Sequence, residues 1–149
     1  MTSRDNRIRA RFINGKTRLT SMLYRTPLRL FETRHPEDEH AAAVVLSSHG
    51  GGMLGGDQVK LSIEAEGNAR LRVTSGANSH IYPHRNLPAD GGETGDGTAA
   101  PTSFTLEGRL TEDARLEYLA EPVVLHAGSR YVQRQNWRLE NNARLLLVD

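Results

Sequence analysis

A short motif that recurs between alternating segments constrains the fold of this chain more than any other feature. Its pattern is [Asn/Asp]-Ala-Arg-Leu, and its copies lie at residues 68–71, 113–116 and 142–145, with a looser fourth copy at residues 14–19. A polar turn precedes each of the three close copies. The segments before those turns alternate between apolar and polar residues, at residues 59–66, 104–110 and 137–140. Period-two alternation is typical of half-buried strands.

We interpret each copy as the turn of a hairpin, with the leucine re-entering the core. Repeated units of this kind predict an all-β chain with little helix, whose hairpins stack into an elongated, β-helix-like or solenoid body. The copies are spaced unevenly, 45 and then 29 residues apart. Chance similarity among short turns is therefore the alternative explanation for the motif. The all-β prediction holds under either explanation.

The rest of the chain follows the same pattern within one predicted domain, residues 1–149. Ile8, Ala10 and Phe12 alternate with arginines, and Asn14-Gly15 is a strong hairpin signal before a returning strand at residues 19–24. Residues 88–103 are poor in apolar side chains and rich in Gly, Asp and Thr, which predicts a mobile loop.

Composition narrows the classes of function. Residues 1–35 hold nine basic and two acidic residues, whereas the remainder holds ten basic and sixteen acidic residues. The basic segment either meets an acidic partner or pairs with the acidic remainder. The net charge of +1, the scattered aromatic residues and the absence of cysteine argue against nucleic-acid binding, disulfides and thiolate metal sites. With no secretory signal and no run of membrane-spanning length, we expect a soluble cytoplasmic protein.

A glycine-rich run is the first candidate functional element. It contains Gly50, Gly51, Gly52, Gly55, Gly56 and Asp57. So many glycines indicate a tight backbone path or a close approach by another backbone or a ligand. The run lacks the Gly-Lys-Ser/Thr ending of a phosphate loop, and a strand rather than a helix follows it. Nucleotide binding is therefore not favoured.

Other polar residues suggest weaker possibilities. His49 and Asp57 are the weak metal-ligand candidates, and they give an alternative function, a small β-rich metal-dependent hydrolase. A glycine run closed by Asp is equally typical of a simple Asx-type turn. His80 and His84 stand in a strand-and-proline context, which favours exposed residues at a strand end. Glu117 and Glu121 are four residues apart. Side chains at even spacing on an extended chain point to the same side, so we expect the two glutamates to share a face.

Several motifs, taken in order, resemble those of the UreD (UreH) family of urease accessory proteins. The matching stretches are residues 15–19, 26–29, 50–57, 69–75 and 116–122. The residues that carry the match outside the glycine run are Arg18, Pro27, Arg29, Thr74, Tyr82, Tyr118 and Pro122. Ala120 stands where the family usually has proline, and His126 where an aromatic residue is usual. The chain resembles roughly the N-terminal half of family members, so we expect it to be incomplete at its C-terminus.

The resemblance implies a non-enzymatic scaffold with no cofactor of its own. Such proteins bind urease apoprotein and a UreF-like partner, which recruits a UreG-like GTPase, and together they promote insertion of nickel with lysine carbamylation. Nickel would then be a transient cargo that crosses an internal passage. The glycines of the run, Asp57 as an inward carboxylate, and Glu117 and Glu121 are the passage candidates that the resemblance implies.

Overall fold

The computed structural model describes residues 6–84 and 100–148, and it consists almost entirely of strands. The strands, with one 3-10 turn, are β1 (Asn6–Ile13), β2 (Lys16–Leu23), β3 (Leu28–Arg34), β4 (Ala42–Ser48), η1 (His49–Gly51), β5 (Gly52–Met53), β6 (Gln58–Glu66), β7 (Arg70–Ser75), β8 (Ser79–Ile81), β9 (Thr102–Leu110), β10 (Arg115–Leu119), β11 (Val123–Leu125), β12 (Tyr131–Leu139) and β13 (Arg144–Val148). The mainly-β prediction is confirmed. No helix in the described ranges is long and apolar enough to cross a membrane.

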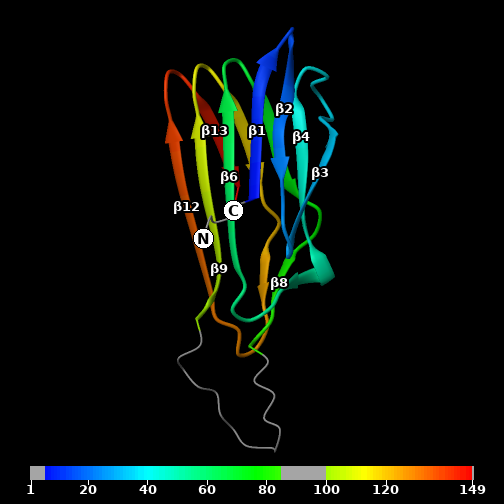
Figure 1. Cartoon of the computed structure of the whole chain (residues 1–149), viewed down its shortest axis with the longest axis vertical. Coiled ribbons are helices and arrows are strands. Elements are labelled where there is room, and N and C mark those ends of the chain that lie inside the picture. The colour runs from blue at the N-terminus through cyan, green and yellow to red at the C-terminus, as the bar shows by residue number, and fades with distance from the viewer. Residues whose placement is uncertain (1–5, 85–99, 149) are drawn as a thin grey trace, which may run out of the picture.

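Three sheets share these strands. Sheet A has the order β12-β9-β6-β1-β2, sheet B the order β13-β10-β7-β4-β3, and sheet C the order β11-β8-β5. From β4 onward, consecutive strands move through sheets B, C and A in turn, and each pairs in parallel with the strand one circuit earlier or later. Among the strand pairs of the described ranges, only β1–β2 and β3–β4 are antiparallel. Figure 1 shows the strands of sheet A side by side along the long axis of the molecule.

The hairpin interpretation is correct for Asn14-Gly15 and wrong for the three close copies of the motif. The first of these links β6 in sheet A to β7 in sheet B, and the other two make the same change of sheet. Their turns stack at one end of the molecule (Figure 1), where the backbone N–H of Arg115 donates to the carbonyl of Ala69 at 2.8 Å and that of Arg144 to Ala114 at 2.9 Å. The motif therefore marks a corner between sheets.

The stacked corners explain why the motif recurs. Leu71, Leu116 and Leu145 occupy one register position on β7, β10 and β13. Leu71 and Leu116 are buried, and the preceding Ala69 and Ala114 are completely buried where the two sheets meet closely. Only a small side chain fits at such a corner. The uneven sequence spacing arises because residues 85–99, outside the described ranges, fall between the first two copies.

The core fills the space between sheets A and B. On β1, Ile8 and Ala10 are fully buried as the alternation predicts, and on β6 the inward residues are Val59, Leu61, Ile63 and Ala65. The intervening arginines of β1 lie outside, where Arg9 binds Glu64 at 2.6 Å and Arg11 binds Glu66 at 2.6 Å. The basic N-terminal segment thus pairs in part with acidic residues of the same chain.

Of the segment predicted as a mobile loop, residues 88–99 lie outside the described ranges. Thr102 and Ser103 instead begin β9, and Thr102 is completely buried. The polar composition of the segment obscured the start of this strand.

Candidate functional site

A cavity of about 720 Å³ lies between the three sheets. Sheet C holds sheets A and B apart here, whereas they meet closely at the stacked corners. Its apolar lining includes Leu46, Val59 and Phe104. Its polar lining includes Ser47, Ser48, Ser75, Ser79, Asn78, Gln133, His80 and Glu121, together with the phenols of Tyr82, Tyr118 and Tyr131.

The polar lining arises from a change in the inward positions of two strands. On β7 the inward series is Leu71, Val73 and then Ser75, and on β4 it passes from Leu46 to Ser48. Each strand is therefore aliphatic through the core and ends in a hydroxyl side chain at the cavity. Burying these hydroxyl groups against apolar side chains would cost free energy, so the polar lining disfavours closure of the cavity by apolar packing.

The glycine run connects β4 to β6 and reaches the cavity at Gly51 and Met53, and another part of the backbone approaches it closely. A Cβ on Gly52 would lie 2.3 Å from the carbonyl oxygen of His80, and one on Gly55 would lie 2.3 Å from the backbone nitrogen of His84. Gly56 has φ of 89°, which is open to glycine at little cost. These glycines therefore allow β5 to pair with β8 and residues 82–84 to cross the run.

Asp57 completes this loop through its own backbone. Its carboxylate oxygen Oδ2 accepts a hydrogen bond from the N–H of Leu54 at 2.8 Å, and its N–H donates to the Leu54 carbonyl at 3.0 Å. The side chain therefore bonds to the backbone three residues back and closes the turn of residues 54–57, whereas an Asx-type turn bonds to the backbone two residues further on. His49 is exposed and its N–H donates to the Pro27 carbonyl at 2.6 Å. Neither side chain lines the cavity, and the described ranges contain no cluster of three or more His, Cys, Asp or Glu suited to a metal ion.

The two candidate glutamates face different surroundings, one at the cavity and the other on the outer face of sheet B. Glu121 follows β10 and lines the cavity. Glu117 points away from the buried Tyr118 on the outer face of sheet B, where its carboxylate binds Arg72 Nε at 2.5 Å and lies 3.7 Å from His35 Nε2. The expectation that both share a face is wrong, because β10 ends at Leu119 and the chain turns before Glu121.

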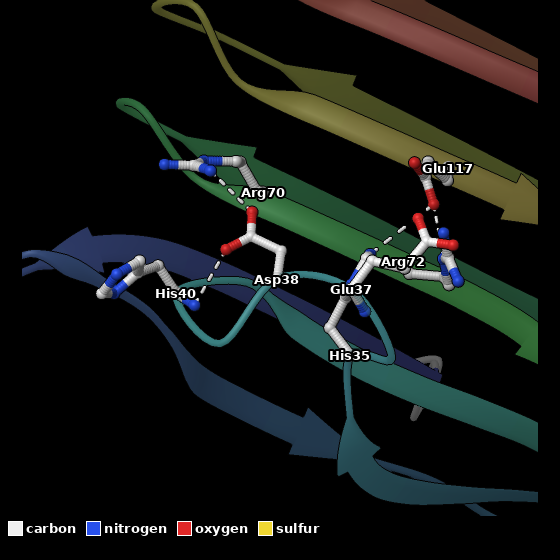
Figure 2. A network of polar contacts seen from close by, with 7 residues as sticks. All are labelled: His35, Glu37, Asp38, His40, Arg70, Arg72 and Glu117. Carbon is white, nitrogen blue, oxygen red and sulfur yellow. Dashed lines mark hydrogen bonds and ion pairs between the residues drawn. The ribbon is translucent and has the colours of Figure 1, made fainter.

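Figure 2 shows Glu117 in a polar network that continues to Asp38 over the outer face of sheet B. Asp38 accepts hydrogen bonds from the backbone N–H of His40 at 2.9 Å and from Arg70 Nη1 at 2.6 Å. Burial acts to raise the pKa of Asp38, but the hydrogen bond from His40 and the charge of Arg70 together lower it below its usual 3.8. This network fixes the 36–40 loop against β7.

The family-motif residues divide between the cavity and the surface. Pro27, Tyr82 and Tyr118 line the cavity. Arg18, Arg29 and Pro122 are exposed, and Thr74 is half-buried on β7. The glycine Gly51 also reaches the cavity wall, whereas Gly50 is exposed at the adjacent turn.

Two features near the cavity were missed at the level of sequence. His80 and His126 form a ring cluster with Tyr82, although they lie 46 residues apart. Thr102 binds the glycine run through its hydroxyl. The signal for the cluster was the histidine at position 126, where the related family usually has an aromatic ring. Pairing it with His80 required the register of sheet C.

The order of the motifs along the sequence agrees with a comparison that covers nearly the whole chain. The family model described as UreD urease accessory protein matches residues 4–149. The chain belongs to the UreD family.

Curated UreD relatives match most of the chain. A urease accessory protein UreD of Cytophaga hutchinsonii is 31% identical over 137 residues, covering 92% of this chain and 43% of the relative. A UreD of Beijerinckia indica is 31% identical over 128 residues, covering 83% of this chain and 43% of the relative. A ureD-like urease accessory protein of Schizosaccharomyces pombe is 29% identical over 150 residues, covering 47% of that protein. The chain thus spans less than half the length of these UreD relatives.

Proposed function

We propose that this chain is a non-enzymatic scaffold of urease maturation in the cytoplasm. It binds urease apoprotein and a UreF-like partner, which brings a UreG-like GTPase, and the complex promotes nickel insertion into the urease active site. Nickel is a transient cargo in this proposal, and the chain has no cofactor of its own. Membership of the UreD family supports the accessory role.

The cavity is the observation that carries the proposal. It is roomy, at about 720 Å³, and its polar lining in the described ranges is mainly hydroxyl and amide groups, with one carboxylate, that of Glu121, and one imidazole, that of His80. Hydroxyl and amide oxygens bind borderline divalent ions less well than imidazole does. An ion crossing this space keeps most of its water and leaves as readily as it enters. Of the candidate residues named from the sequence, we place Gly51 and Glu121 at this passage.

The circulation of the chain through three sheets supports the same proposal. We infer a β-helix-like body in which successive circuits stack in register and leave a hollow where sheet C separates the other two. A passage inside such a body runs along the stack.

Co-expression tests the proposal. The chain carries an affinity tag and is co-expressed with urease subunits and a UreF-like protein from one organism, and the recovered complex is assayed for nickel-dependent urease activation. We expect urease and the partner to co-purify, and activation to exceed that of cells without the chain. A soluble, folded chain that recovers neither protein would contradict the scaffold role.

A further inference from the structure

Two histidines from separate circuits of the chain meet beside the cavity. His80 lies on β8, and His126 directly follows β11, which pairs in parallel with β8. Nδ1 of His80 lies 3.0 Å from Nε2 of His126, and the ring centroids are 5.2 Å apart. One imidazole donates and the other accepts, according to their tautomers.

Hydrogen bonding and ring stacking hold this pair in place. The N–H of His126 donates to the Ile81 carbonyl at 3.0 Å, which extends the ladder of sheet C past the end of β11. Tyr82 stacks on His126 with centroids 4.6 Å apart and planes inclined by 23°. The pairing of β8 with β11 therefore fixes the positions of both histidines.

The separation of the two nitrogens suits a metal ion. Imidazole nitrogens bind borderline divalent ions at about 2.1 Å, so two of them at right angles around one ion lie about 3.0 Å apart. Imidazole is also a favoured ligand of Ni²⁺, which accepts tetragonal arrangements of nitrogen and oxygen ligands. In the structure the two nitrogens face each other across their hydrogen bond, so metal binding requires a shift of tautomer, which frees the second nitrogen lone pair, and a rotation of both rings, which points the two lone pairs at one ion.

We propose that His80 and His126 form a two-imidazole site for a divalent cation of the nickel class, at the boundary between cavity and solvent. His80 lines the cavity and His126 is exposed, so an ion can arrive from water on one side and leave into the cavity on the other. Two protein ligands leave the remaining positions to water, which keeps the ion exchangeable. The identity of the ion as nickel rests on the proposed function, whereas the site itself does not.

The site is tested on the isolated chain, without urease. Ni²⁺ is titrated into the folded chain in a buffer that does not chelate it, while the imidazole signals are followed by nuclear magnetic resonance. We expect the paramagnetic ion to broaden the signals of His80 and His126 before those of His35, His40 and His49. Earlier broadening at His49, or uniform broadening of all six histidines, would overturn the proposal.

Substitutions give the second arm of the test. His126→Phe keeps a ring against Tyr82 but removes a ligand, so equilibrium dialysis should show Ni²⁺ affinity reduced at least about tenfold. His40→Gln, at an exposed histidine outside the pair, should leave the affinity unchanged. Equal binding by wild type and His126→Phe would overturn the proposal. A chain that binds Ni²⁺ through the pair but does not co-purify with urease would instead contradict only the proposed function.

Discussion

The hydroxyl of Thr102 accepts a hydrogen bond from the backbone N–H of Gly56 at 3.1 Å and joins residues 46 positions apart. The same hydroxyl donates to the carbonyl of Leu54 at 3.0 Å. Thr102 is completely buried at the start of β9. One side chain therefore satisfies two backbone groups of the glycine run and holds that run against sheet A.

This contact predicts the effect of replacing Thr102 by valine. Thr102→Val keeps the shape of the side chain but leaves both backbone groups without their partner, which should cost about 1–3 kcal/mol of unfolding free energy. Urea denaturation measures the loss. Thr105→Val, at a half-buried position on the same strand, is the matched control and should change little. Equal stability of Thr102→Val and wild type would contradict the anchoring role.

The close approach of β8 to the glycine run gives a second prediction. A Cβ on Gly52 meets the His80 carbonyl and the Tyr82 ring, so Gly52→Ala should separate β5 from β8 and cost about 1–3 kcal/mol. At Gly76 the nearest atom to a new Cβ is a side-chain methyl of Val45, 3.2 Å away, which can adjust. Gly76→Ala is thus the control, and urea denaturation should place it near wild type. If Gly52→Ala were equally stable, the packing explanation of the run would fail.

Much of the fold follows from local sequence, but the pairing of its strands does not. The alternation of Ile8 and Ala10 with arginines identified β1 and its buried face, and Asn14-Gly15 identified the first hairpin. The turn before Ala114 satisfies the same local signals as a hairpin turn, since Glu112 and Asp113 both have positive φ. Whether such a turn folds the chain back in one sheet or passes it to another depends on partners a full circuit away.

The candidate site was predictable only in part for the same reason. Asp57 and the glycines are adjacent in sequence, so their loop was visible, although Asp57 closes it by bonding back to Leu54 rather than through the Asx-type turn that was one of the alternatives. Glu121 was named as a candidate, and the structure places it on the cavity. The contact between His80 and His126 depends on the parallel register of β8 and β11, which no local pattern encodes.

The hydrogen bond between Asp57 and Leu54 predicts that this carboxylate matters for the loop more than for the ion. Asp57→Asn keeps an oxygen that accepts from the Leu54 N–H, whereas Asp57→Ala removes it. We expect Asp57→Ala to lose about 0.5–1.5 kcal/mol of unfolding free energy and Asp57→Asn to lose less. Urease activation by Asp57→Asn should remain near that of wild type. A loss of activation with the complex intact would instead assign Asp57 to the ion passage.

The Asp38 network predicts a dependence of stability on pH. Because the pKa of Asp38 is lower in the folded chain than its usual 3.8, its carboxylate stabilises the fold above that value, and the contribution is lost as pH falls through the folded pKa. Asp38→Asn should therefore destabilise the chain more at pH 6 than at pH 3, as measured by urea denaturation.

A neighbouring carboxylate provides the control for this effect. Glu37 is exposed, and the described part of the chain shows no ion pair for its side chain. Glu37→Gln should have a small effect that barely changes between the two pH values. An Asp38→Asn effect of the same size at pH 3 and pH 6 would contradict the assigned role of the Arg70 and His40 contacts.

The proposed passage of nickel through the cavity is tested most directly by filling the cavity and measuring urease activation. Ser75→Leu places an apolar side chain into the cavity from the end of β7, and Thr105→Leu adds similar bulk on the outer side of β9. With both variants folded and recovered with urease and the UreF-like partner, we predict that Ser75→Leu sharply reduces nickel-dependent activation and that Thr105→Leu does not. Full activation by a complex that contains Ser75→Leu would contradict the claim that nickel crosses this cavity.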